Sequence, residues 1–209
     1  MSYKTFVSMN IAIIGVSEIA GAYALAFAHA GHEVFLSWKD GEKQKVSPAL
    51  LKVDGIHVCP IEQAADISDL VIIATRPEDL REVSYWLGDV RRKVIIDASS
   101  NVDTGSDEKV SANAIRSITG SPNIVQVFHT RGYEQILKPL FAGESFQLII
   151  AGESKKAKEI TKILTQELGI SRVKDLGGND AVPLFNAMTT CWREMSVGTG
   201  AVTGRKAHS

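Results

Sequence analysis

Three small residues near the start of the chain, Gly15, Ser17 and Ala20, have the spacing of a turn that binds phosphate. Glycine in the first position permits a tight turn, and a small third residue lets a helix pack closely against a strand. Ser17 replaces the glycine that lets the backbone approach a pyrophosphate, so its side chain must turn aside or donate its own hydroxyl. Glu18 suits the helix dipole but would repel a bound phosphate. The pattern therefore indicates an altered pyrophosphate site.

Further polar residues follow later apolar runs. Thr75, Ser99 and His129 stand where such runs end, and open α/β sheets bind ligands at the carboxyl ends of their strands. His129 is either the acid that protonates a carbonyl, imine or flavin position near neutral pH, or a hydrogen-bonded histidine of the strand. Arg76 could bind an acidic substrate or a cofactor phosphate, or lie in solvent. Asp97 is expected to have a structural role at its strand end.

Apolar runs alternate with helical segments nearly throughout the chain, which explains how these residues could be positioned. LVIIA, KVIID and IVQVF are typical of strands buried on both faces of a parallel sheet. Strands are expected near 10–14, 33–37, 56–59, 70–74, 93–97, 124–128 and 146–151. Helices are expected over 18–30, 42–53, 61–66, 78–87, 107–118, 132–138 and 154–168. The alternation predicts an α/β fold with a doubly wound, mostly parallel sheet of the Rossmann-like, NAD(P)-binding type.

The organisation predicted for the chain is one NAD(P)-binding domain over 1–178, with a short C-terminal helix and flexible tail over 179–209. One helical stripe runs through this extension and comprises Leu184, Phe185, Met188, Cys191, Trp192 and Met195. The stripe would pack back on the sheet or against a second subunit in a homodimer. We therefore expect a homodimer, with packing on the sheet as the alternative.

Composition excludes several classes of function. The 209 residues are 44% hydrophobic and 22% charged, as in an ordinary soluble domain. A formal net charge of -1 gives no reason to expect nucleic acid or a membrane surface as a partner. No apolar run approaches the roughly 20 residues that span a bilayer. The two cysteines, Cys59 and Cys191, form no metal-binding motif. We expect a cytoplasmic protein without a metal site.

The residues after the second predicted strand bear on the choice of nucleotide. An acidic residue about 20 positions past the turn usually binds the ribose 2′-hydroxyl of NAD. Here Ser37 could bind a 2′-phosphate and Lys39 could supply positive charge, with no acid before Asp40. Trp38 could stack on the adenine or cover the edge of the sheet. NADP is therefore favoured over NAD.

In these features the chain resembles the family of NADP oxidoreductases that use the deazaflavin coenzyme F(420). The resemblance covers roughly residues 10–185, in order. It comprises the phosphate turn, AHAGHEV leading to Ser37, DLVIIATRPEDLREV, KVIIDASSNV, IVQVFHT and VKDLGGNDAVPLF. The order and spacing are specific to the superfamily, and they do not identify a deazaflavin substrate.

The resemblance implies roles for particular positions. Gly15, Ser17 and Ile19 would form the phosphate turn, and Ser37 with Lys39 would bind the 2′-phosphate, although Trp38 replaces the arginine usual there. Thr75 and Pro77 would border the ribose and nicotinamide, with Arg76 between them as an unusual charged insertion. Ala98 and Ser99 would line the nicotinamide pocket, and Phe128 would close it. His129 stands where the family often has asparagine, next to the expected hydride acceptor.

The function predicted is hydride transfer between NADPH and a small-molecule acceptor, which is a flavin or deazaflavin co-substrate or another small molecule. Such chemistry needs little more than two rings held face to face, so no nucleophile or metal is expected. Two alternatives stay open at this point. One is an imine or ketone reductase of the wider Rossmann group. The other is a non-catalytic NADP-sensing or partner-binding module, which the residues Ser17 and Glu18 favour.

Overall fold

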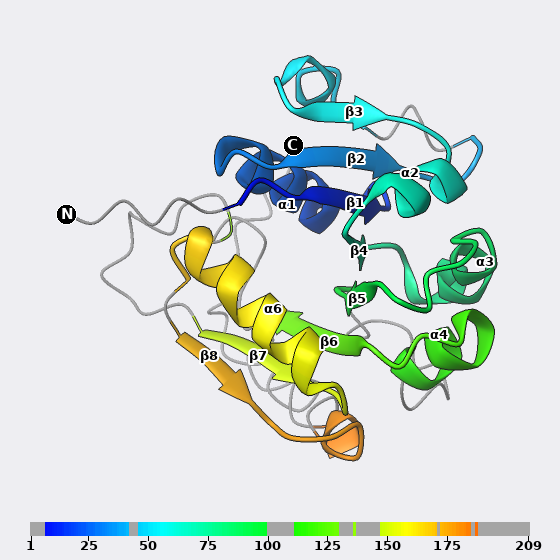
Figure 1. The fold of residues 1–209 in the computed structure, drawn as a ribbon, viewed down its shortest axis with the longest axis vertical. Coiled ribbons are helices and arrows are strands. Elements are labelled where there is room, and N and C mark those ends of the chain that lie inside the picture. Colours follow the sequence, from blue (N-terminus) through cyan, green and yellow to red (C-terminus); the bar gives the residue numbers. More distant parts are fainter. Residues whose placement is uncertain are drawn as a thin grey trace, which may run out of the picture.

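The computed structural model of the chain describes residues 7–41, 46–99, 111–129, 147–170 and 172–184, together with residues 136 and 187. Within these residues one sheet of eight strands has the order β3-β2-β1-β4-β5-β6-β7-β8 (Figure 1). The strands are β1 (Asn10–Ile14), β2 (Glu33–Ser37), β3 (Ile56–Val58), β4 (Leu70–Ile73), β5 (Val94–Asp97), β6 (Ile124–His129), β7 (Gln147–Ala151) and β8 (Arg172–Asp175). The predicted α/β fold with a doubly wound, mostly parallel sheet is confirmed.

The direction of the strands changes once across the sheet. All neighbouring pairs from β3 to β6 are parallel, whereas β7 is antiparallel to β6 and β8 is parallel to β7. The register sets Ser37 opposite Ile14, Ile14 opposite Ile73, Ile73 opposite Asp97, and Asp97 opposite Gln126. The carboxyl ends of β2, β1, β4 and β5 therefore lie side by side, and the loops that follow them share one edge of the sheet.

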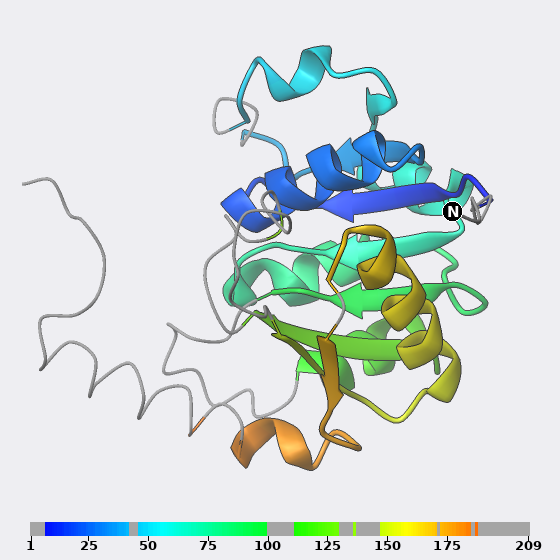
Figure 2. The same ribbon diagram turned by 90° about the vertical axis from the view of Figure 1, so that its left-hand side faces the viewer.

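Helices cover both faces of the sheet (Figures 1 and 2). On one face lie α1 (Glu18–His29) and α6 (Lys155–Glu167), and on the other lie α2 (Ile61–Ile67), α3 (Leu80–Tyr85) and α4 (Ser111–Thr119). Two short 3-10 turns, η2 (Leu50–Lys52) and η3 (Pro77–Asp79), lie in the connections after β2 and β4. This arrangement places α1 directly after β1 and α3 close after β4.

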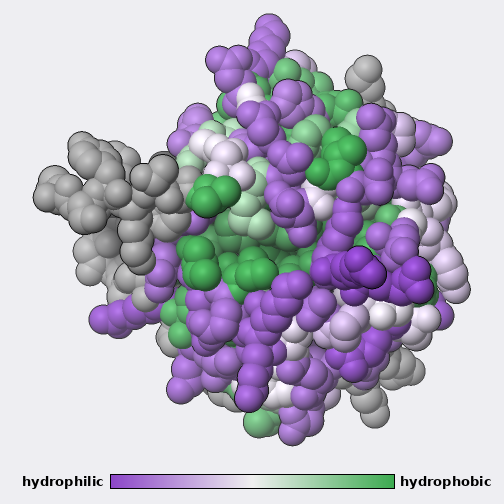
Figure 3. Space-filling view, viewed as in Figure 1, coloured by the Kyte–Doolittle hydropathy of each residue, from purple (hydrophilic) through white to green (hydrophobic). Residues whose placement is uncertain are grey.

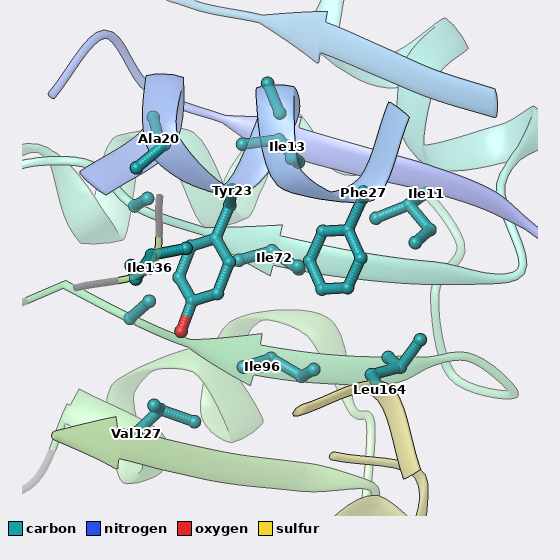
Figure 4. Packing of buried hydrophobic residues seen from close by; sticks show 14 of the residues in the cluster. Ile11, Ile13, Ala20, Tyr23, Phe27, Ile72, Ile96, Val127, Ile136 and Leu164 are labelled. Carbon is teal, nitrogen blue, oxygen red and sulfur yellow. The ribbon is translucent and has the colours of Figure 1, made fainter. Parts of the chain in front are cut away.

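The central strands are apolar on both sides because helices cover both sides. Every residue of β4 is buried, and alternate side chains belong to separate apolar clusters on the two faces. On the α1 face, Tyr23 and Phe27 stack with ring centroids 5.7 Å apart and lie over Ile72 and Ile96 (Figure 4). This packing fixes α1, and with it the turn that precedes α1, relative to the strands.

The structure differs from two of the predicted elements. The helix expected over 42–53 is wrong for the described residues 46–53, where only the turn η2 forms. Pro48 lies in that segment and is poorly compatible with a helix interior. The edge strand β8 was not expected, because its sequence RVKD is mostly polar and largely exposed.

Several other predictions fall outside or largely outside the described residues. Of the helix expected over 132–138, only Ile136 is described, and it is a buried residue of the core. A helical segment covers residues 181–184, but the rest of the predicted apolar stripe, beginning with Phe185, lies outside the described part. In the described part of the chain, no helix combines the length and apolar character that crossing a bilayer requires.

The face of the molecule seen in Figure 1 has an uneven surface. Hydrophobic residues gather in its middle, and hydrophilic residues surround them (Figure 3). A comparison of the two ribbon views shows that β1 runs from this face toward the far side of the molecule. The phosphate turn, which follows β1, therefore lies on the far side. The apolar surface and the predicted binding edge are therefore on separate sides of the molecule.

Candidate functional site

The turn between β1 and α1 packs tightly against the end of β4. Gly15 has φ +140°, and a Cβ added there would lie 2.3 Å from the carbonyl oxygen of Ala74. Its N–H donates to the carbonyl oxygen of Ser37 at 2.8 Å. Both the backbone conformation and the space require glycine at this position. Gly15 therefore connects the ends of three neighbouring strands.

Ser17 is the N-cap of α1, and its hydroxyl faces the protein. The Oγ atom accepts a hydrogen bond from the N–H of Ala20 at 3.1 Å and donates to the carbonyl oxygen of Ala74 at 2.7 Å. The side chain thus turns aside, which is one of the two outcomes expected for a serine here. N-cap serines stabilise helices in this way, and the hydroxyl has no second proton for a ligand.

The first turn of α1 presents backbone N–H groups at the binding edge. Glu18 is exposed, and Ile19 is half-buried against the apolar core. Among the described residues, none accepts a hydrogen bond from the N–H groups of Glu18 or Ile19. Such groups, together with the positive end of the helix dipole, favour an anion. The Glu18 carboxylate lies in the same turn and opposes that preference.

The residues after β2 differ from one another in their surroundings. Ser37 is buried, and its hydroxyl has no hydrogen-bond partner among the described residues. Trp38 is half-buried and packs against the main apolar cluster, so the structure favours a covering role for its ring. Lys39 reaches across to the connection after β4. Ser37 thus has a buried polar atom without a partner among the described residues.

Lys39 and Arg76 are held by carboxylates in what we call the Asp79 cluster, defined as Lys39, Arg76, Asp79 and Glu82. The Lys39 ammonium lies 2.8 Å from Oδ1 of Asp79 and also contacts Glu82. Arg76 donates to Oδ2 of Asp79 through Nε at 2.9 Å and through Nη2 at 2.7 Å. Both oxygens of one aspartate are thus occupied by the two cations that the sequence assigned to phosphate binding.

The ionisation of this cluster follows from these contacts. Hydrogen bonds to Asp79 and then Glu82 raise the pKa of Lys39 to about 12. Burial acts to raise the pKa of Asp79, but hydrogen bonds from Lys39 and Arg76 outweigh it, and the pKa lies below its usual value. Lys39 and Asp79 are therefore both charged at neutral pH.

Thr75 and Pro77 position this cluster. Thr75 is buried directly after β4, and its N–H lies against Gly15, 3.0 Å from where a Cβ of that glycine would be. Pro77 is the first residue of η3, where a fixed φ and a missing N–H are tolerated. The turn η3 then directs Asp79 back toward Lys39.

A second polar group lies at the end of β5, and we call it the Asp97 network. The Asp97 carboxylate is buried and accepts hydrogen bonds from the N–H of Ser99 at 3.0 Å, from the hydroxyls of Ser99 and Ser111, and from the Gln126 amide at 3.3 Å. Burial raises the pKa of Asp97, although these hydrogen bonds act in the opposite direction. Ser99 is therefore committed to Asp97, and the predicted structural role of Asp97 is confirmed.

The residues expected around the nicotinamide are not all brought together. Ala98 packs in the apolar cluster that α1 and α6 cover, whereas Phe128 packs with Ala151 and Val182 in a separate cluster. His129 is the last residue of β6, opposite Leu148, and its side chain is not among those described. The structure thus groups the phosphate turn with Ser37, Lys39 and Thr75, but it separates Ala98 from Phe128.

Sequence reasoning missed four residues of these two groups: Asp79, Glu82, Ser111 and Gln126. The sequence contains one local indication of Asp79, which is an acidic residue in the first turn after a proline. Its partner Lys39 is 40 positions away, so the pairing itself leaves no local pattern. Within the residues that the structure describes, no three histidine, cysteine, aspartate or glutamate side chains are grouped to hold a metal ion.

Comparison with known proteins agrees with the fold described above. Residues 10–101 match the model of the family described as NADP oxidoreductase, coenzyme F(420)-dependent. A proposed F(420)-dependent NADP reductase from Arthrobacter sp. FB24 has a TM-score of 0.79 and 19% identity, covering 92% of this chain and 96% of that one. A hypothetical protein from Sinorhizobium meliloti has a TM-score of 0.70 and 20% identity, with 87% and 90% covered.

Longer enzymes share the fold as well. A variant of the imine reductase from Myxococcus stipitatus, solved with NAD+, has a TM-score of 0.69 and 19% identity over 92% of this chain. The chain spans 62% of that enzyme's length. At these identities the likeness to solved structures establishes the fold. The resemblance seen in the sequence is confirmed: over residues 10–101 the chain matches the family of coenzyme F(420)-dependent NADP oxidoreductases.

Proposed function

We propose that the protein is an NADPH-dependent oxidoreductase that binds its dinucleotide along the carboxyl edge of β2, β1 and β4. The observation that carries this proposal is the open first turn of α1, where the N–H groups of Glu18 and Ile19 have no acceptor among the described residues. Gly15 holds this turn against β4, as a pyrophosphate site requires. The family match over the same residues supports the assignment.

The residues present fit a nicotinamide dinucleotide in two respects. The α1 N-terminus suits its pyrophosphate, and the orphaned hydroxyl of Ser37 suits a polar group of its ribose. A buried hydroxyl without a partner costs about 1 to 3 kcal/mol, so a ligand that satisfies Ser37 gains affinity there. NADPH, when bound, would supply a hydride to the acceptor, which also takes up a proton.

The acceptor and the catalytic acid belong to this proposal. The family match favours a flavin or deazaflavin acceptor, and the fold shared with imine reductases makes imines the main alternative. His129, at the end of β6, is the proposed proton donor. His129→Asn should leave NADPH binding intact and lower turnover about a hundredfold, as expected for loss of a general acid. The homodimer, the cytoplasmic location and the division at residue 178 stay predictions.

Titration calorimetry with NADPH and NADH tests the binding step. The wild-type protein should bind NADPH, and Glu18→Gln should bind it about threefold more tightly, since one repulsive charge at the helix N-terminus is worth a few tenths to 1 kcal/mol. Glu62→Gln is the matched control, because Glu62 is also exposed in the first turn of a helix, α2. If neither dinucleotide binds at millimolar concentration, the proposal is wrong.

Turnover is then measured as NADPH oxidation with flavin, deazaflavin, quinone and cyclic imine acceptors. Reduction of a flavin-like acceptor supports the leading assignment, and reduction of the imine alone moves the protein to the imine reductases. Tight NADPH binding without oxidation by any acceptor would favour a sensing module instead.

A further inference from the structure

In the proposed binding mode a 2′-phosphate would approach the Asp79 cluster, whose charges are already paired. Lys39 follows β2 by two residues, and Arg76 follows Thr75, whose N–H abuts Gly15. The cluster therefore borders the phosphate turn on the side of the adenosine ribose. It also ties the connection after β2 to the connection after β4.

Counted over the described residues, the balance of charge in this region does not favour an added anion. Two cations meet two carboxylates in the cluster, and Glu78 lies 3.4 Å from Arg76 as a third carboxylate. A phosphate monoester carries close to two negative charges at neutral pH. To reach Lys39 or Arg76, it must compete with carboxylates that already hold them, and like charges in proximity cost affinity.

The two carboxylates on Lys39 differ in their freedom to move. The Asp79 side chain is 9% exposed, and both of its oxygens accept hydrogen bonds. The Glu82 side chain is 49% exposed on α3 and can turn into solvent with little loss. Asp79 is therefore the competitor that a ligand cannot displace by a simple side-chain rotation.

Resting on the proposed function, we infer that Asp79 determines cofactor specificity, because it withholds Lys39 and Arg76 from the 2′-phosphate of NADPH. NADH has no phosphate at that position, so its affinity is independent of this competition. The ratio of NADPH affinity to NADH affinity is consequently smaller than Ser37, Lys39 and Arg76 would produce if Asp79 were absent. Neutralising Asp79 removes the competitor that both cations share and raises the preference for NADPH.

Two small probes test the inference without the nicotinamide. Adenosine 2′,5′-bisphosphate carries the 2′-phosphate, and adenosine 5′-monophosphate lacks it. Calorimetry should show that Asp79→Asn binds the bisphosphate about fivefold more tightly than wild type, with the monophosphate changed less than about twofold. The gain should shrink at high salt, since screening weakens attraction between exposed charges.

Two further variants complete the design. Glu82→Gln should tighten the bisphosphate by about twofold, because the exposed carboxylate competes less strongly. Glu159→Gln is the matched control, since Glu159 pairs with Lys162 on α6, away from the site, and it should change neither probe. Circular dichroism and the unfolding midpoint verify that each variant is folded.

Several outcomes would overturn the inference. Weaker bisphosphate binding by Asp79→Asn would mean that the carboxylate orients the cations for the phosphate, and equal changes with both probes would mean a purely structural role. If Asp79→Asn does not fold, an unchanged bisphosphate affinity in Glu82→Gln overturns it as well. If the wild-type protein binds neither NADPH nor NADH, the proposed function is rejected. If it binds them and the variants keep the wild-type preference for the 2′-phosphate, only the role of Asp79 is rejected.

Discussion

Two buried aspartates at neighbouring strand ends, Asp79 after β4 and Asp97 in β5, have opposite electrostatic surroundings. Asp79 meets two cations, Lys39 and Arg76, across the surface of the binding edge. Within the described part of the chain, Asp97 meets only neutral donors, which come from Ser99, Ser111 and Gln126. The pKa is below its usual value for the first and above it for the second.

This difference shows that the charge of the partners decides how a buried carboxyl ionises. Burial acts to raise the pKa of both groups, because it disfavours the charged form. Full positive charges outweigh this cost at Asp79, whereas neutral hydrogen bonds at Asp97 do not. Asp79 is thus a charged carboxylate that pairs with nearby cations, and Asp97 is a hydrogen-bond acceptor for neutral groups at the end of β5.

The largest effect is expected from Asp97→Ala. Four hydrogen bonds lose their acceptor in the interior, so the free energy of unfolding should fall by about 3 kcal/mol at neutral pH. Urea unfolding followed by circular dichroism measures this loss. Asp89→Ala is the control, since Asp89 is exposed and pairs with Arg91 at the surface, so its removal should have a much smaller effect. A loss below about 1 kcal/mol at Asp97 would mean that the donors find other acceptors.

A pH series of Asp97→Asn and Asp79→Asn should show opposite trends. The raised pKa of Asp97 means that its stabilising contribution is present in acid and is lost as pH rises through the folded-state pKa. The lowered pKa of Asp79 means that its contribution is present near neutrality and is lost as pH falls through the folded-state pKa. From about pH 3 to about pH 7, the stability deficit of Asp97→Asn should therefore shrink, and that of Asp79→Asn should grow.

The pH series is measured on each variant against wild type at every pH, so that all other titrating groups cancel. Parallel trends for the two variants would contradict the assigned environments, because they require partners of the same charge. Identical deficits at every pH would mean that neither carboxyl has a shifted pKa.

The smallest effect is expected from Glu82→Gln. Its carboxylate contacts Lys39 but is half exposed, so the free energy of unfolding should change by less than about 0.5 kcal/mol. The same urea titration measures it. A loss comparable with that of Asp97→Ala would show that Glu82, and not Asp79, carries the stability of the cluster.

Much of the fold was predictable because the strands are apolar on both sides. All seven expected strands form, including runs such as Leu70–Ile73 and Val94–Asp97 that are buried throughout. The alternation with helices then left few possible topologies. β8 escaped prediction because an exposed edge strand such as RVKD needs no apolar pattern. The helix expected over 42–53 does not form in the described residues 46–53, where Pro48 opposes the helical spacing of the apolar residues.

The candidate site was predictable only where its signal is local. Gly15 and the capping position Ser17 are two positions apart, so their spacing identified the turn. The pairing of Lys39 with Asp79 is set by β2 and β4 ending at the same edge, and no short motif encodes such a contact. The commitment of Ser99 to Asp97 likewise depends on Gln126 and Ser111 arriving from elsewhere in the fold.

The close approach of Gly15 to Ala74 limits how this protein can be redesigned. A single added methyl group would meet a backbone carbonyl, which cannot rotate away as a side chain can. Engineers who wish to change the nucleotide used by this scaffold therefore have no latitude at Gly15. Their adjustable positions are the side chains at 39, 76 and 79, which surround the turn without supporting it.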